Sequence, residues 1–182
     1  MKNFRCVIGS QKGVTLLELI VVAAMVAIGV AIAVPLSIPL VHKSQFRGGA
    51  LEVMTTVMTA RSNSVRDNDS WRVVFNYGAN SFDLVDFNGT TINTHNLSEY
   101  GYGIHLVNEA TCGHADKNWN NTVISPAAFI SFTGRGTASN GSVFLEDASD
   151  DVCYAVSASN NGVIRLHRYK GAKPYDLNSW EN

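Results

Sequence analysis

Apolar residues near the start of the chain form one unbroken segment, and most of the remaining sequence is polar with short apolar repeats. From Leu19 to Leu36 every residue is apolar, Gly or Pro. A helix over residues 16–34, at ~1.5 Å per residue, covers roughly 28 Å, close to the ~30 Å hydrocarbon core of a bilayer. The pattern therefore predicts a transmembrane helix over about residues 16–36. Pro35 and Pro39 each remove one helix hydrogen bond, so we expect them to loosen the helix locally.

After these prolines the apolar residues recur every three or four positions, which is typical of an amphipathic helix over about residues 40–66. The predicted apolar face consists of Phe46, Ala50, Val53, Met54, Val57 and Met58. A cluster of short polar residues at 67–70 ends the pattern. The predicted N-terminal helix thus covers residues 14–66, membrane-spanning in its first half.

Beyond residue 70 the apolar period changes to two and the segments shorten, as expected for β-strands. Strands are predicted over residues 71–77, 82–87, 128–133, 142–146, 152–158 and 162–168, with a weaker one over 103–107. Turn residues at 78–80 and 159–162 join neighbouring strands into hairpins, whereas residues 88–125 read as mostly loop. The fold class is therefore α+β, a long N-terminal helix packed on an antiparallel β-sheet domain over residues 67–182.

Charge separates the first 13 residues from the rest. They carry three of the 14 basic side chains and no acidic one, which leaves 11 basic against 15 acidic side chains. A net charge of -1 excludes a global basic field that would hold nucleic acid non-specifically. The basic start before the apolar helix orients the N-terminus toward the cytoplasm and the polar region outside.

Glu18 separates three interpretations of the N-terminal segment. A secretory signal peptide cleaved after Ala31-Ile32-Ala33 and a simple membrane anchor both leave it without a role. A carboxylate in an apolar span costs about 2.5–3.5 kcal/mol and usually marks function. The third interpretation comes from the segment Gly13-Val14-Thr15-Leu16-Leu17-Glu18, which resembles the prepilin-peptidase site of type IV pilins and type II secretion pseudopilins.

That resemblance implies cleavage after Gly13, methylation of the new N-terminus at Val14, and removal of residues 1–13 as a leader peptide. Glu18 then becomes the fifth residue of the mature chain, and Pro35 takes the position of a helix-loosening proline common in the family. It also implies a pilin-like fold and a single-pass protein of the bacterial inner membrane with a periplasmic C-terminal domain. A carboxylate at residue 18 can neutralise the α-amine of a neighbouring subunit, which makes it an assembly determinant.

The C-terminal half resembles one branch of that family, the H-type minor pseudopilins and the related FimT/FimU-type minor pilins. The matching segments are Ala60-Arg61, Phe132-Thr133-Gly134-Arg135-Gly136, and the hairpin from Val156-Ser157 to Gly162-Val163-Ile164-Arg165. The resemblance implies a non-enzymatic minor pseudopilin of a type II secretion system. The alternative is a minor pilin of a type IV pilus, with a role in adhesion, motility or DNA uptake. Expected partners are other pseudopilins or pilins, prepilin peptidase and the membrane.

Two clusters of reactive or charged side chains remain. Cys112 and Cys153 are the two cysteines of the polar region and favour a disulfide if that region is extracytoplasmic; with His114 and His167 they could instead bind a metal, but the usual ligand spacing is missing. The sequence thus predicts no metal site, cofactor or catalytic residue. The candidate surface patch is Arg165, His167, Arg168 and Lys170, which fits a solvated strand end first, a protein contact second and DNA third.

Overall fold

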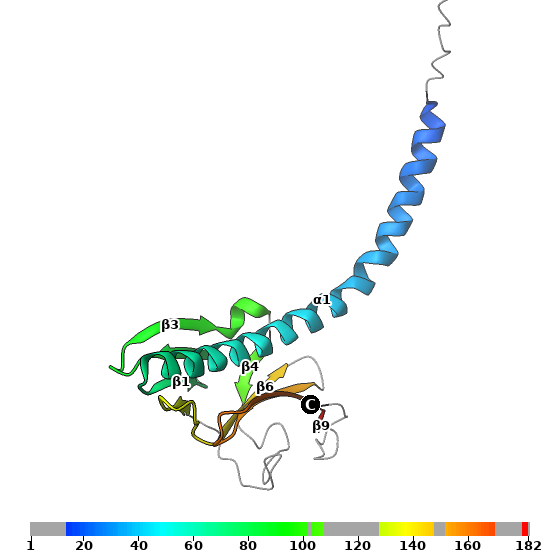
Figure 1. Cartoon of the computed structure of the whole chain (residues 1–182). Helices are drawn as coiled ribbons and strands as arrows, with labels where there is room; N and C mark the ends of the chain where they lie inside the picture. The colour runs from blue at the N-terminus through cyan, green and yellow to red at the C-terminus, as the bar shows by residue number, and fades with distance from the viewer. Residues whose placement is uncertain (1–13, 102, 108–127, 148–151, 170–179, 182) are drawn as a thin grey trace, which may run out of the picture. The chain divides into compact units, whose positions relative to one another are not determined.

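The computed structural model describes residues 14–101, 103–107, 128–147, 152–169 and 180–181. The chain divides into two compact units, Met1–Val41 and His42–Asn182. One helix, α1 (Leu16–Asp67), contributes residues to both units, and all described strands belong to the second (Figure 1). The second unit is called the C-terminal unit below.

Both ends of α1 carry recognisable capping signals. The Thr15 hydroxyl accepts a hydrogen bond from the backbone N–H of Glu18 at 3.2 Å, so Thr15 is the N-cap. At the other end Asn68 adopts a positive φ of 52°, and the N–H of Asp69 donates to the carbonyl of Ser64 at 3.1 Å. This is a Schellman arrangement, in which asparagine tolerates the left-handed conformation. The polar cluster after Arg66 therefore ends the helix as the sequence predicts.

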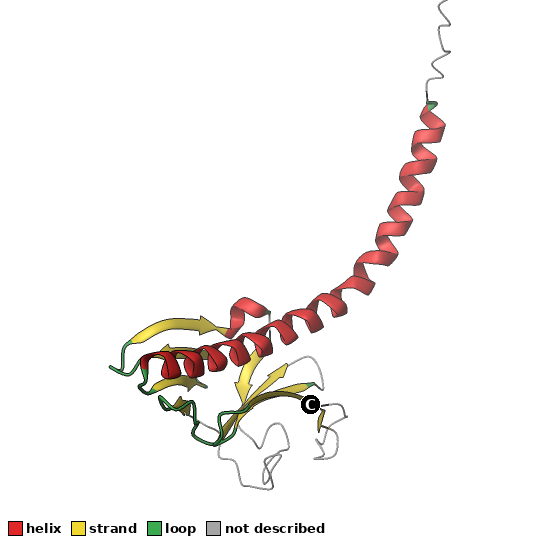
Figure 2. Ribbon diagram, in the orientation of Figure 1, coloured by secondary structure: helices red, strands yellow, loops and turns green. Residues whose placement is uncertain are grey.

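In the described part of the chain, nine strands form two antiparallel sheets; Figure 2 shows the strands in yellow beside the helix. The first has the order β3-β2-β1-β5 and comprises β1 (Trp71–Asn76), β2 (Ser81–Val85), β3 (Thr91–Asn96) and β5 (Phe129–Phe132). The second has the order β4-β6-β7-β8-β9 and comprises β4 (Ile104–Val107), β6 (Gly141–Asp147), β7 (Cys153–Ala158), β8 (Ile164–Tyr169) and β9 (Trp180–Glu181). The β1–β2 and β7–β8 hairpins confirm the two predicted turns.

The second half of α1 supplies one wall of the main core. Its side chains Phe46, Ala50, Val53, Val57 and Ala60 are buried with residues of both sheets. Phe46 packs edge-on against Tyr154 of β7, with ring centroids 4.9 Å apart. Strand β6 is buried along its whole length, because a second apolar cluster containing Phe144 lies on its other face. The predicted α+β fold, a helix packed on antiparallel sheets, is confirmed.

Two details of the sequence prediction are wrong. Residues 91–100, read as loop, form β3 and a 3-10 helix, η1 (Leu97–Tyr100). Strand β3 is an edge strand with almost entirely exposed polar side chains, so it lacks the apolar alternation by which strands are detected. Met58, placed on the buried helix face, is 50% exposed, because the face that packs on the sheets passes through Val57 and Ala60 instead.

Candidate assembly site

The first half of α1 exposes apolar side chains along its length. From Leu16 to Val41 the large apolar side chains are 44–78% exposed, with Val21 and Leu16 at the extremes. Within the described residues, α1 is the one helix long and apolar enough to cross a membrane. Exposed apolar surface of this extent is stable only in lipid or against other apolar helices.

Helix α1 begins two residues after Val14, and Glu18 lies in its first turn. The backbone of Glu18 bonds to the Thr15 hydroxyl. Its carboxylate has no hydrogen bond or ion pair with any residue in the described part of the chain, and its surroundings are exposed. Gly13 lies outside the described residues. The arrangement presents a carboxylate beside the predicted mature N-terminus without a partner among the described residues.

Pro35 and Pro39 both lie inside α1, which is helical on either side of each. Ser37, between them, donates its hydroxyl to the carbonyl of Ala33 at 2.8 Å. The two prolines deprive the carbonyls of Ala31 and Pro35 of their donors, so this bond does not replace a lost one and is an ordinary back-bond of a helical serine to the carbonyl four residues earlier. The loosening role of the two prolines stays a prediction.

Cys153 begins β7 and is fully buried. The other two cysteines, Cys6 and Cys112, lie outside the described residues, so the pairing with Cys112 stays a prediction. His114 also lies outside them. In the described ranges no three His, Cys, Asp or Glu side chains are grouped as they would be around a metal ion.

The basic segment on β8 does not form one surface patch as predicted. Arg165 and Arg168 are exposed, but His167 is fully buried and its Nε2 lies 3.1 Å from the hydroxyl of Ser157. His167 therefore acts as an interior polar residue. Lys170 lies outside the described residues. Two guanidinium groups remain of the predicted patch in the described part of the chain.

Two histidines that are isolated in the sequence have partners in the structure. His42 Nδ1 lies 2.9 Å from a carboxylate oxygen of Asp147, which is fully buried at the end of β6. His95 Nδ1 lies 3.4 Å from Glu52 of α1, and its ring stacks on Phe82 with centroids 5.1 Å apart. Sequence reasoning missed both, because more than 40 residues separate the two members of each pair.

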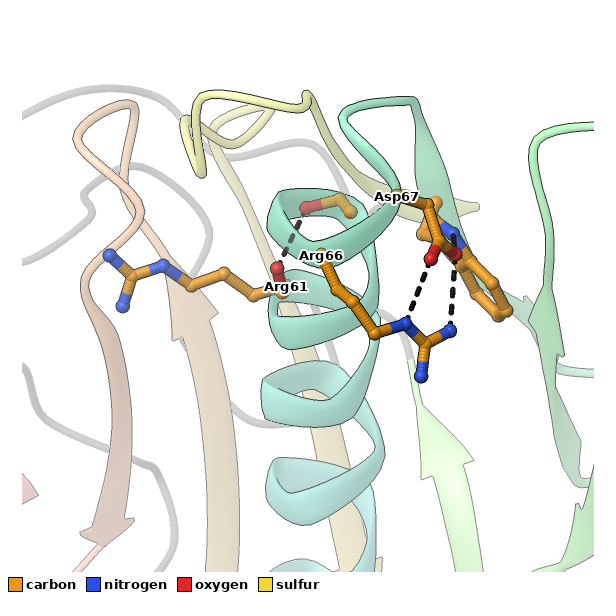
Figure 3. Close-up of polar contacts among 5 residues, drawn as sticks. Arg61, Arg66 and Asp67 are labelled. Carbon is orange, nitrogen blue, oxygen red and sulfur yellow. Dashed lines mark hydrogen bonds and ion pairs between the residues drawn. The ribbon is translucent and has the colours of Figure 1, made fainter.

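The C-terminal end of α1 is fixed to the sheets by polar side chains. Arg66 donates to Asp67 through two nitrogens at 2.8 and 3.1 Å (Figure 3). The indole N–H of Trp71 donates to the same carboxylate at 3.0 Å. The bonds from Arg66 lower the pKa of the Asp67 carboxyl below its ordinary value. Helix end and first strand are thereby joined through one exposed carboxylate.

Close backbone approaches at glycines complete this junction. The Nε of Arg61 donates to the carbonyl of Gly136 at 3.3 Å. A Cβ at Gly134 would lie 2.5 Å from the backbone of Asn68, and one at Gly162 would collide with the carbonyl oxygen of Gly136. The segment 134–136, predicted as a turn between strands, is that turn. Through these approaches the 134–136 turn contacts both the end of α1 and the β7–β8 turn.

Comparison with known proteins finds a family model that matches the N-terminal segment and solved structures that share the fold. The family model for the prokaryotic N-terminal methylation motif matches residues 8–34. The crystal structure of the type IV minor pilin FimU of Pseudomonas aeruginosa matches with a TM-score of 0.50 at 13% identity, covering 76% of this chain and 98% of FimU.

The minor pseudopilin EpsH, from the type 2 secretion system of Vibrio cholerae, also has a TM-score of 0.50 at 13% identity, covering 67% of this chain and 95% of EpsH. No curated protein matches this chain in sequence. At 13% identity the similarity to the two structures concerns the fold.

Proposed function

We propose that this chain is a type IV pilin-like protein and, more specifically, a minor pseudopilin of a type II secretion system; the N-terminal methylation motif and the fold shared with FimU and EpsH support this. In this role it is a non-catalytic subunit that enters a short periplasmic filament used for protein export. The observation that carries the proposal is the capped helix that begins at Leu16, within the motif and three residues after Gly13, and exposes its apolar side chains.

The same helix supports a membrane-anchored state before assembly. The basic side chains of residues 1–13 precede the apolar span, which favours a cytoplasmic N-terminus and a periplasmic C-terminal unit in the bacterial inner membrane. Prepilin peptidase then removes residues 1–13 and methylates Val14. The mature chain would start one residue before the N-cap Thr15, so that processing leaves the helix intact.

Glu18 is the proposed assembly determinant. Its carboxylate lies one helical turn from the new α-amine of Val14, in a span where unpaired charge is costly. Pairing with the α-amine of a neighbouring subunit removes that cost only when the two helices are in one register. Each subunit is thus incomplete alone, which couples charge neutralisation to filament assembly.

A second candidate is a minor pilin of a type IV pilus, supported by the resemblance of the segment 132–136 and the 156–165 hairpin to FimT/FimU-type proteins. A deletion strain separates the two roles. The proposed function predicts that exported proteins accumulate in the periplasm while surface pili and twitching are normal. The second candidate predicts the reverse.

Processing of the chain tests the shared part of both roles. Mass analysis of the protein from its native membranes should give a chain that starts at Val14 and carries one added methyl group. A chain that starts at Val34 would establish a secreted protein with an ordinary signal peptide. An intact Met1 would establish a simple membrane anchor.

A further inference from the structure

A groove of about 670 Å³ lies on the C-terminal unit between the end of α1 and two turns of the sheets. Met58 and Val65 line it from α1, and Arg135 lines it from the turn between β5 and β6. Val163 lines it from the turn before β8, and Ile164 from the first residue of β8. Three of these apolar side chains are well exposed, Met58 at 50%, Val65 at 52% and Val163 at 41%.

These exposed apolar side chains lie together in one groove and are not scattered singly over the surface. Met58 and Val65 are seven positions apart, so they lie on one face of α1 two turns from each other. Val163 reaches the same groove from a turn about 100 residues further along the chain. Contiguous exposed apolar side chains of this kind mark an interaction site.

The charge of the groove indicates the chemistry of its partner. Its charged lining consists of Arg61 and Arg135, and it has no acidic lining residue among the described ones. The Nε of Arg61 donates to the Gly136 carbonyl at 3.3 Å, which holds the guanidinium in place. Its two terminal nitrogens have no hydrogen bond or ion pair within the described ranges. A guanidinium held in this way is prepared to bind a carboxylate through both terminal nitrogens.

A carboxylate on a partly apolar protein segment fits both features. Nucleic acid binding depends on many cations along a phosphate backbone and on aromatic stacking surfaces, whereas this groove has two cations, three exposed aliphatic or thioether side chains and no aromatic lining residue among those described. A protein interface combines an apolar centre with a few charged contacts. Beyond residue 13 the chain carries more acidic than basic side chains, whereas the charged residues of this groove are both basic. The groove can therefore orient an acidic partner.

We propose that this groove docks a different subunit of the same filament, through a segment that places a carboxylate between Arg61 and Arg135 and apolar side chains against Met58, Val65 and Val163. The inference rests on the proposed function, since it requires filament neighbours. A minor subunit is outnumbered in its filament, so its neighbour at the groove is another subunit and not a second copy.

Site-specific photo-crosslinking in native membranes tests the groove. A benzophenone amino acid replaces Met58 in the full chain, and the same amino acid at Leu17 of the apolar helix serves as a positive control for filament contact. Mass spectrometry identifies the partner peptide. The Met58 position should give an adduct with another pilin-like subunit, at a peptide that contains Asp or Glu.

Charge variants then test the carboxylate. Arg135→Glu should lower the yield of this adduct about ten-fold, and Arg135→Lys should retain most of it. Arg72→Glu, the same change at an exposed residue of β1, should leave the yield unchanged. Equal urea midpoints of the three variants exclude unfolding as the cause of a loss.

The outcomes separate this inference from the proposed function. If Leu17 gives adducts and Met58 gives none, the groove proposal is wrong and the proposed function stands. The same holds if Met58 gives an adduct whose yield Arg135→Glu does not reduce. An adduct to nucleic acid or to a second copy of this chain also overturns it. No adduct with a pilin-like subunit at either position contradicts the proposed function, and the groove proposal fails with it.

Discussion

Replacing Gly162 with alanine should destabilise the C-terminal unit strongly, although the change adds only one methyl group, because Gly162 is buried in its turn. Gly162 adopts a φ of +79°, a conformation that costs an L-residue roughly 1–2 kcal/mol. The added Cβ would overlap the carbonyl oxygen of Gly136 and approach the Nε of Arg61 to 3.0 Å. One of the two turns must therefore move.

The expected loss follows from three contributions. Backbone strain costs about 1–2 kcal/mol, displacement of the Gly136 segment about 1–3 kcal/mol, and loss of its hydrogen bond from Arg61 about 1–3 kcal/mol. Because these contributions overlap, we expect a total of about 3–6 kcal/mol, a large part of the ~5–15 kcal/mol that stabilises an ordinary domain. The substitution should lower the free energy of unfolding because the added Cβ meets backbone atoms, which cannot rotate aside as a side chain can.

Urea unfolding of the detergent-solubilised chain, followed by near-ultraviolet circular dichroism, measures this loss. The urea midpoint of Gly162→Ala should fall by at least about 1.5 M. Gly48→Ala is the matched control, since a Cβ there meets nothing within 4 Å and lies inside α1. It should raise stability by about 0.5–1 kcal/mol. Equal midpoints for the two variants would refute the reasoning.

Four other predictions concern single side chains. Glu18→Ala should leave the C-terminal unit folded but reduce crosslinking to filament neighbours, and wild-type crosslinking would exclude the charge pair. Cys153→Ser should remove one intramolecular bridge with Cys112, seen by non-reducing peptide mapping, and cost about 3–4 kcal/mol for a closed loop of about 40 residues; recovery of two free thiols from the wild-type protein would contradict this. His42→Ala should cost about 1–3 kcal/mol in urea unfolding, because it removes a partner of a buried carboxylate; an unchanged midpoint would show that this contact contributes nothing. The lowered pKa of Asp67 means that its ionised form stabilises the fold above the ordinary Asp pKa of about 3.9, so the midpoint difference between wild type and Asp67→Asn should shrink as pH falls below that value; a difference that stays constant down to pH ~2 would assign the effect to packing.

The N-terminal motif and the apolar helix can be predicted from the sequence because each depends on residues that are close together along the chain. The motif Gly13 to Glu18 is contiguous, and an apolar span in lipid needs no partner segment of its own chain to form a helix. The polar cluster after Arg66 ends α1 because Asn68 accepts a positive φ. Most strands and both predicted hairpins also follow from alternation and turn residues over fewer than ten positions.

Other features depend on contacts between distant segments. Strand β3 is polar apart from Ile92, so its identity as a strand comes from pairing with β2 and not from its own pattern. The exposure of Met58 was decided by the angle at which α1 packs on the sheets, since neighbouring Val57 is fully buried. Helical periodicity predicts which face of a helix is apolar, but it locates the boundary between buried and exposed positions only to within about one residue.

The sequence alone determined the long apolar helix, the N-terminal methylation motif and the alternation of short strands, because each depends on residues that are close together along the chain. Only the tertiary structure decided that His167 is interior, that His42 meets Asp147, and that Arg61 and Arg135 border one apolar groove. Each of these contacts joins side chains from separate strands, turns or helix ends. The pattern of residues along the chain does not indicate which of these segments meet in space.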